Sequence, residues 1–196
     1  MFIELTDHLR CLGGHEEAYL VLLPDRMKGR EVQAGHLGCP VCGWSTAFSE
    51  GVVEFGGGRW SDAPTRLTGE AVQALLGLSG PGGYVALAGS AAAVIPELER
   101  LMPGIALVAV NPPPALAASG ASILRARELP LKSSSMRGVV LGEDLAGDPG
   151  WVASAVRATL PGLRVVGAGE LPDLPGIEIL GAAAGVWVSR RLPSSP

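Results

Sequence analysis

Cys11-Leu12-Gly13-Gly14-His15 and Gly38-Cys39-Pro40-Val41-Cys42-Gly43 are the two stretches that decide the fold of the first part of the chain. They hold all three cysteines of the protein, in the spacing C-x3-H, a 23-residue span and C-x2-C. This pattern is typical of a zinc ribbon, in which two short turns supply two ligands each to a tetrahedral ion. We therefore predict a site for Zn²⁺ made of Cys11, His15, Cys39 and Cys42. Because the protein supplies all four ligands, the ion is expected to hold structure and to perform no chemistry.

The three cysteines admit other interpretations than a zinc site. A disulfide is disfavoured because three is an odd number and nothing resembles a secretory signal peptide. A redox-active pair made by the last two cysteines should lie between a strand and a helix, whereas residues 44–48 do not resemble a helix start. His8 and His36 are alternative fourth ligands, and His15 is preferred because it has the knuckle spacing.

The span between the two ligand pairs is expected to form a β-hairpin. Residues 18–23 form an apolar run, a turn-rich stretch follows, and residues 31–37 suit a return strand. Further on, the glycine-rich residues 57–65 are typical of a linker. We therefore divide the chain into a zinc-ribbon domain over residues 1–56, the linker, and a second domain over residues 66–196.

Composition sets further bounds on function. Hydrophobic residues make up 47% of the chain, which is ample for a core. Residues 1–58 carry four Lys and Arg against eight Asp and Glu, and the remaining residues carry eleven against eleven. The basic footprint that drives nucleic-acid binding is therefore missing overall, although RNA stays possible through local patches. Without an apolar run of roughly 18 residues or a signal peptide, we expect a cytoplasmic protein that does not associate with membranes.

Short apolar runs alternate with helical patterns in the rest of the chain. Strands are expected over residues 84–88, 105–110, 122–124, 138–141 and 163–166, helices after Thr68, over 91–102, near 115–118 and from the Asp148-Pro149 cap to Leu160, and an antiparallel hairpin over 177–180 and 186–189. This alternation predicts an α/β fold with a doubly wound, mostly parallel, Rossmann-like sheet. Pro96 either kinks the second helix or marks its true first turn.

Residues 5–11, 37–42 and 48–55 carry a first resemblance to a known family. Together they resemble the small zinc-ribbon family whose members activate tRNA, rRNA and protein methyltransferases. That family typically has Cys-Pro-x-Cys, Tyr-Pro-Ile and Asp-Gly-Val elements. Here residues 47–49 replace the middle element, and the C-x3-H knuckle replaces the usual first C-x2-C. The resemblance covers roughly residues 1–56 and implies a structural zinc ion and a methyltransferase as protein partner.

Residues 66–190 carry a second resemblance, to class I S-adenosylmethionine-dependent methyltransferases. Residues 84–90 correspond to that family's first strand and glycine-rich loop. Residues 128–140 resemble its Leu-Pro-Phe to Val-Val stretch, and residues 158–166 resemble its Leu-x-Pro-Gly-Gly turn. The resemblance implies a methyltransferase-like Rossmann domain, with S-adenosylmethionine held at Gly89, Ser90 and Asn111.

The cofactor residues depart from that family's pattern. The loop needs successive glycines for close backbone approach to the methionine and ribose, whereas Gly89 stands alone before Ser90 and three alanines. The family places Asp or Glu at the end of its second strand, where this chain has the uncharged Asn111. Losing a charged acceptor for the ribose should cost on the order of 1.5–3 kcal/mol. We therefore expect no measurable binding of S-adenosylmethionine at tens of micromolar.

Several further groups admit two interpretations each. The Asn-Pro-Pro sequence 111–113 resembles a catalytic motif, but it follows the second strand instead of the fourth. Glu143 and Asp144 form either a general-base pair at a strand end or part of a solvated loop. Residues 133–135, all serine, either hold phosphate through turn amides or form a polar surface loop. The four tryptophans either stack on bases or pack inside the protein.

Three functions follow from these observations. The first is a zinc-binding, degenerate methyltransferase-like protein, a pseudoenzyme that binds a methyltransferase or the translation machinery without turning over S-adenosylmethionine. The second is an active methyltransferase with an atypical site, acting on RNA or protein. The third is a zinc-ribbon adaptor whose second domain binds another nucleotide or small metabolite. The identity of the partner and the oligomeric state, including a homo-oligomer, stay open.

Overall fold

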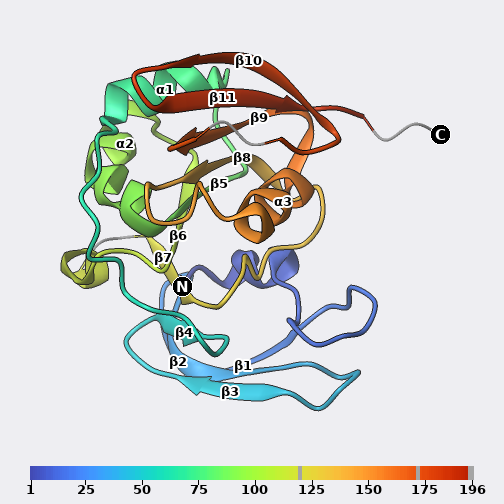
Figure 1. Ribbon diagram of the computed structural model, residues 1–196. Coiled ribbons are helices and arrows are strands. Elements are labelled where there is room, and N and C mark those ends of the chain that lie inside the picture. The colour runs from blue at the N-terminus through green and yellow to red at the C-terminus, as the bar shows by residue number, and fades with distance from the viewer. Residues whose placement is uncertain (119–120, 171–172, 194–196) are drawn as a thin grey trace.

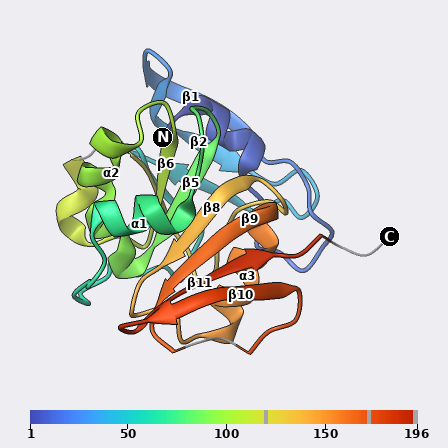
Figure 2. The same cartoon turned by 90° about the horizontal axis from the view of Figure 1, so that it is seen from above.

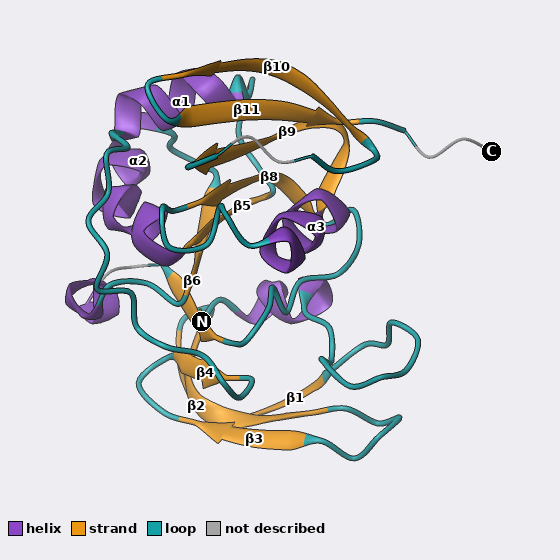
Figure 3. Cartoon of the chain, in the orientation of Figure 1, coloured by secondary structure: helices purple, strands orange, loops and turns teal. Residues whose placement is uncertain are grey.

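Two β-sheets organise the computed structural model, which describes residues 1–118, 121–170 and 173–193 (Figure 1). The smaller sheet is antiparallel, with strand order β1-β2-β3. Its strands are β1 (Val21–Lys28), β2 (Glu31–Gly38) and β3 (Ser45–Phe48). The predicted hairpin between the two ligand pairs is therefore present. We call residues 1–48, which include this sheet, the N-terminal module; it lies at the bottom of Figure 3.

The larger sheet contains eight strands in the order β10-β11-β9-β8-β5-β6-β7-β4. They are β4 (Val52–Glu54), β5 (Tyr84–Ala88), β6 (Ala106–Val110), β7 (Ser122–Arg125), β8 (Met136–Leu141), β9 (Thr159–Ala168), β10 (Ile177–Ala183) and β11 (Val186–Arg191). Neighbouring strands from β4 to β9 pair in parallel, and the final hairpin pairs antiparallel to β9. The expected α/β fold with a mostly parallel, Rossmann-like sheet is confirmed.

Helices connect most of the parallel strands, and polar side chains cap the starts of two of them. They are α1 (Gly69–Leu76), α2 (Ile95–Leu101) and α3 (Pro149–Ala158), with 3-10 helices η1 (Ile3–His8), η2 (Gly89–Val94) and η3 (Pro114–Ala118). Thr68 and Asp148 accept backbone N–H bonds at the starts of α1 and α3. Pro96 lies in the first turn of α2, so it marks the helix start and does not kink it. Within the described residues no helix is both long and apolar enough to cross a membrane.

The boundary between α3 and β9 differs from the prediction. The apolar stripe was expected to continue to Leu160, but the helix ends at Ala158 and the strand starts at the next residue. Met136 of β8 pairs with Thr159, and the pairing continues after a shift at Gly138 and Arg164. The helix ends before Pro161, because the residue that precedes a proline disfavours the helical backbone conformation and proline itself has no N–H to donate.

Side chains that alternate along the strands of the large sheet pack into two separate cores, one on each face of the sheet. One core packs α1 and α2 against residues such as Val85 and Leu87 of β5. The other core packs α3 against their neighbours Ala86 and Ala88. Because successive side chains of a strand point to opposite faces, each face of the sheet needs its own cover. Figure 2 shows α1 and α2 on one side of the sheet and α3 on the other.

The N-terminal module covers part of the α3 face. Residues 126–135, between β7 and β8, form no helix that could cover it. Leu5, Leu9 and Leu37 of the module are buried in one cluster with Leu129 and Leu131 of that loop. Two backbone bonds join the segments, from Arg10 N–H to the Pro130 carbonyl at 3.0 Å and from Lys132 N–H to the His8 carbonyl at 2.8 Å.

The chain passes from the module directly into the large sheet. Val52, Val53 and Glu54 of β4 pair in parallel with residues 123–125 of β7, at the sheet edge. Val53 and Phe55 are buried in the cluster shared with the module. A strand that follows the Cys and His region is thus part of the same sheet as the Rossmann-like strands.

A shared core predicts shared stability. Leu131→Ala empties a fully buried position between the module and the sheet, and we expect it to lower the free energy of unfolding by about 2–5 kcal/mol. Urea denaturation should show one transition, shifted as a whole. Leu23→Ala, at a side chain that is 62% exposed, is the control and should change stability by less than about 0.5 kcal/mol. Two separate transitions in the wild type would contradict the shared core.

Candidate functional site

Four metal-ligating side chains converge in the N-terminal module. The donor atoms of Cys11, His15, Cys39 and Cys42 all lie within 4.8 Å of one another. The Cys11 and Cys42 sulfurs are 3.6 Å apart, and the Cys39 sulfur is 3.3 Å from Nε2 of His15. A tetrahedral zinc ion with its usual bond lengths has S···S edges of about 3.8 Å and S···N edges of about 3.6 Å. The four groups are therefore close enough to bind one metal ion.

Local hydrogen bonds orient these ligands. Nδ1 of His15 lies 2.6 Å from the Glu16 carbonyl oxygen, so this nitrogen carries the proton and Nε2 keeps its lone pair for a metal. The Gly13 N–H donates to the Cys11 sulfur at 3.3 Å. In the second turn, the Gly43 N–H donates to the Cys39 carbonyl at 3.0 Å, with Gly43 at φ +72°. Glycine permits this left-handed turn without strain.

The two other histidines lie outside this group. The His8 ring packs against Tyr84, with 4.7 Å between ring centroids. Nε2 of His36 lies 3.6 Å from a carboxylate oxygen of Asp25. The sequence preference for His15 over its two rivals therefore agrees with the geometry.

The thiols differ in how readily they ionise. Burial raises the pKa of Cys11 to about 11. Burial also raises the pKa of Cys39, but hydrogen bonds from the Cys42 and Val41 N–H groups outweigh it and lower that pKa to about 7. A metal ligand must be the thiolate. Cys39 therefore ionises more readily than Cys11 does.

The predicted cofactor residues Gly89 and Ser90 follow β5, at the carboxyl edge where open α/β sheets bind ligands. The Ser90 N–H donates to Oδ1 of Asp144 at 2.9 Å, and its hydroxyl donates to Oε2 of Glu143 at 2.8 Å. Gly89 has φ +63°, and a Cβ there would lie 2.3 Å from the Asp144 carboxylate. The loop is therefore shaped to hold the chain's own carboxylates.

Asn111, the third predicted cofactor residue, also forms hydrogen bonds within the protein. Its side-chain oxygen accepts the Ala126 N–H at 2.9 Å, and its amide nitrogen donates to the Ala126 carbonyl at 2.7 Å. The side chain is buried and the backbone adopts φ +51°. These two hydrogen bonds join the ends of β6 and β7. The Asn111 side-chain oxygen, which would accept a ribose hydroxyl in a cofactor site, accepts the Ala126 N–H instead.

Residues 56–66, which we call the strap, cross the carboxyl edge of the sheet. In Figure 1 this segment runs from β4 to α1 along the side on which the parallel strands end. Gly58 lies close to the ends of β6 and β7. A Cβ added to this glycine would lie 2.2 Å from the Ala126 backbone nitrogen and 2.8 Å from the Asn111 side-chain oxygen. The Ser61 N–H donates to the Pro112 carbonyl at 3.1 Å, and its hydroxyl donates to Asp144 at 2.8 Å.

Arginine side chains fasten the strap at both ends. Arg125 donates to the Gly58 carbonyl at 3.0 Å, and its guanidinium lies 4.9 Å from the centre of a Trp60 ring. Arg66 donates to Glu143 from its backbone at 2.6 Å and from Nε at 3.2 Å. The strap therefore contacts residues at the ends of β6, β7 and β8.

The carboxylates at this edge are held as structural acceptors. Burial raises the pKa of Glu143, but the hydrogen bonds from Arg66 and Ser90 outweigh it and lower that pKa. A lowered pKa makes a carboxylate a weaker general base. Neither the pair Glu143 and Asp144 nor the Asn-Pro-Pro sequence presents a free side chain here, because the Asn111 amide is bound to Ala126.

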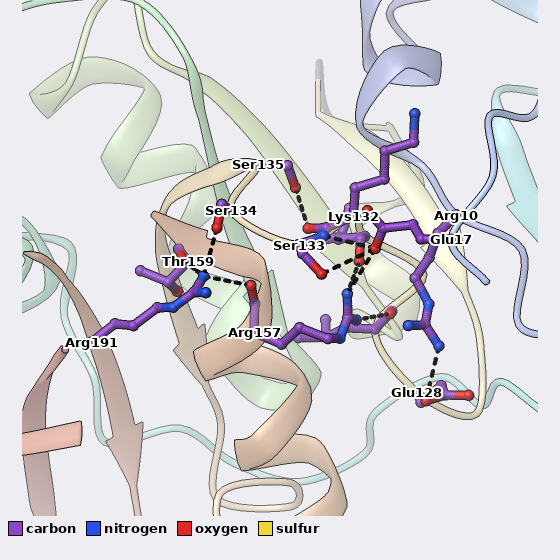
Figure 4. Close-up of polar contacts among 12 residues, drawn as sticks. Arg10, Glu17, Glu128, Lys132, Ser133, Ser134, Ser135, Arg157, Thr159 and Arg191 are labelled. Atoms are coloured by element: carbon purple, nitrogen blue, oxygen red, sulfur yellow. Dashed lines mark hydrogen bonds and ion pairs between the residues drawn. The ribbon is translucent and has the colours of Figure 1, made fainter. Parts of the chain in front are cut away.

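The serine turn at residues 133–135 binds an anion that belongs to the chain itself (Figure 4). Oε2 of Glu17 accepts the Ser133 N–H at 2.9 Å and its hydroxyl at 3.2 Å, and lies 3.5 Å from Arg157. The next two turn amides donate to the carbonyls of Arg157 and Ala158. Glu17 follows His15 by two residues, so this contact links the metal-ligand loop to the large sheet.

The tryptophans divide between interior and surface. Trp151 and Trp187 are buried in the core. Trp44 stacks on Phe55, with 5.2 Å between ring centroids and 15° between ring planes. Packing therefore accounts for Trp151 and Trp187, whereas Trp44 and Trp60 are only partly buried.

Sequence reasoning missed the strap and the Glu17 contact. Residues 57–65 were interpreted as a linker, because glycine runs are typical of flexible connections. A glycine such as Gly58 also permits close backbone approach, and that was the available signal. No sequence pattern marks Glu17, because its partners Ser133 and Arg157 are 116 and 140 residues away.

Comparisons with known proteins concern the fold alone. No protein-family model matches the chain, and a search of curated proteins finds no similar sequence. Among solved structures, two crystal structures of the antibiotic-resistance methyltransferase Kmr are similar at 12% identity. One covers 70% of this chain and 99% of that chain with a TM-score of 0.44, and the other covers 69% and 99% with a TM-score of 0.40.

The Asn111 bonds predict the result of a charge change. Asn111→Asp replaces the donor to the Ala126 carbonyl with a second acceptor, so we expect stability at pH 7 to fall by about 1–3 kcal/mol. Repulsion and burial raise the folded-state pKa of the new carboxyl, so the loss should diminish as pH falls toward its ordinary value of about 4. Thermal unfolding from pH 7 to 4 measures this, with the partly exposed Gln33→Glu as control. Equal stability of the two variants at pH 7 would contradict it.

Proposed function

We propose that this protein is a zinc-stabilised, methyltransferase-like binding protein that acts through a partner and does not turn over S-adenosylmethionine. The observation that carries the proposal is the strap, because residues 56–66 lie where a Rossmann-like sheet would receive its ligand. The proposal has three parts: a structural zinc ion, a carboxyl edge filled by the chain itself, and a role in binding.

The donor set supports zinc as the ion. Three thiolates and one imidazole are typical of structural zinc, and the observed S···S and S···N separations of 3.6 and 3.3 Å suit its tetrahedral bond lengths. Four protein ligands leave no position for water or substrate. The ion would therefore hold the loop that carries Glu17 and the turn that precedes β3, and it would supply no catalytic group.

The strap supports the absence of cofactor turnover in two ways. Its backbone at Gly58 lies against Ala126 and Asn111, and the Ser61 hydroxyl donates to Asp144, so a bound cofactor would have to displace it. The side chains of Asn111, Glu143 and Asp144 are also already paired, so a ligand that binds them would exchange existing hydrogen bonds for new ones. Such an exchange gains little net free energy, because an intramolecular hydrogen bond and its replacement are of similar strength.

The partner is proposed to be a protein, and specifically a methyltransferase. This part rests on the resemblance of the first 56 residues to zinc-ribbon activators. The N-terminal module also carries large exposed apolar side chains, including Tyr19, Leu23 and Val41 at 72%, 62% and 61% exposure. Exposed apolar surface of this kind favours protein contact. Co-purification from cells with an affinity-tagged chain would identify the partner.

Metal analysis tests the first part. Protein purified without chelators should contain one zinc ion per chain, because binding free energy at such a site is folding free energy. His15→Asn should lose the ion, and His36→Asn should keep it as the matched control. Because the module shares its core with the large sheet, removal of zinc by a chelator should lower the unfolding temperature of the whole chain. A zinc-free protein with unchanged stability would remove this part of the proposal.

Calorimetric titration with S-adenosylmethionine tests the second part. We expect no binding at tens of micromolar in the wild type. The double variant Ser61→Ala and Arg66→Gln loses strap contacts to Asp144 and Glu143, and it should bind the cofactor more tightly than the wild type does. Arg100→Gln, an exposed arginine of α2, is the control. A low-micromolar dissociation constant for the wild type would favour the second candidate, an active methyltransferase acting on RNA or protein.

A further inference from the structure

A cavity of about 430 Å³ lies beside the strap, between the metal-ligand loop and the end of β7. Its lining includes Leu12, Trp44, Phe55, Gly56 and Arg127. Cavities of this size hold small ligands when they combine an apolar wall with a few polar groups. The cavity is distinct from the contacts of Gly58 and Ser61, because it opens where the strap begins.

The wall of the cavity is aromatic. Trp44 and Phe55 stack almost in parallel, at 15°, and Phe55 is buried while the Trp44 side chain stays partly exposed. An indole held in place by a second ring offers a rigid flat surface. Such a surface stacks well on another flat ring, because every nucleobase has a π-face.

The floor next to this wall is glycine backbone. Gly56 has φ +89°, and a Cβ added there would meet no atom within 4 Å. The Arg127 N–H donates to the Gly56 carbonyl at 3.2 Å, which fixes the start of the strap against the cavity. Gly56 lines the cavity without a side chain, and its backbone is exposed.

Arg127 gives the cavity a donor-only polar group. Its Nη2 donates to the Leu12 carbonyl at 3.1 Å, which uses one of the five N–H groups of a guanidinium. The side chain is otherwise exposed at the cavity. Arginine pairs with two acceptors on one edge, as guanine offers with O6 and N7, whereas adenine offers one acceptor and one donor there.

We propose that this cavity binds a guanine base, stacked on Trp44 and paired with Arg127. The shared chemistry is the base itself, which a free nucleotide or a single-stranded RNA can supply. Because the chain lacks an overall basic footprint, base contacts carry the interaction and phosphate contacts add little. This inference goes beyond the proposed function and holds whichever way the S-adenosylmethionine titration turns out.

Calorimetric titration with GMP and AMP tests the base preference. GMP should bind about 5- to 150-fold more tightly than AMP, the discrimination that one bidentate arginine contact supplies. A labelled six-nucleotide RNA with one central guanine, compared with its all-adenine counterpart by fluorescence anisotropy, separates the two sources. Binding of GMP alone identifies a nucleotide site, and tighter binding of the RNA identifies a strand. No saturable binding of either probe would overturn the proposal.

Variants then assign the contact. Arg127→Gln should bring GMP and AMP to within about threefold of each other, because the donor pair is lost. Arg100→Gln removes the same charge far from the cavity and should preserve the preference. Trp44→Leu should weaken both nucleotides by about tenfold, and Trp44→Phe should restore most of the loss. Zinc content and circular dichroism verify that each variant is folded. An unchanged GMP preference in Arg127→Gln would overturn the assignment.

Discussion

The packing of the N-terminal module against one face of the large sheet is the interaction on which the rest of the structure depends. The loop between β7 and β8 forms no helix, so that face would expose Leu129 and Leu131 to water. The buried leucines of the module cover them and form a single core with them. Burial of apolar surface is the largest favourable term in folding, and here it joins the metal-ligand region to a sheet that follows it in sequence.

This packing fixes the geometry of the carboxyl edge. The module is followed by β4, which pairs with β7, and the strap therefore starts at a defined edge of the sheet. From there it can reach α1 only by crossing the ends of the parallel strands, where Gly58, Ser61 and Arg66 bind the groups that follow them. The place where an open α/β sheet receives a ligand is thus determined by how the preceding module is anchored.

The metal ligands and the large sheet are connected by short chains of contacts. Glu17 is two residues beyond His15 and binds the turn before β8, and Leu12 accepts a bond from Arg127 after β7. A change in the metal-ligand loop would therefore alter contacts at both ends of the loop between β7 and β8. The Cys and His region thus covers part of the α/β fold and also brings four metal-ligating side chains together.

The sequence by itself determined the local elements and the group of four metal-ligating side chains. Ligand spacing in short turns, capping residues such as Thr68 and Asp148, and alternating apolar runs are local patterns, so the Cys and His group and the α/β class could be predicted from them. Only the tertiary structure decided the strap, the Asn111 bonds to Ala126 and the Glu17 contact. Each of these joins residues from 15 to more than 100 positions apart, and hydrogen bonds over such separations depend on how strands are ordered in the sheet. Local propensity carries no information about that order.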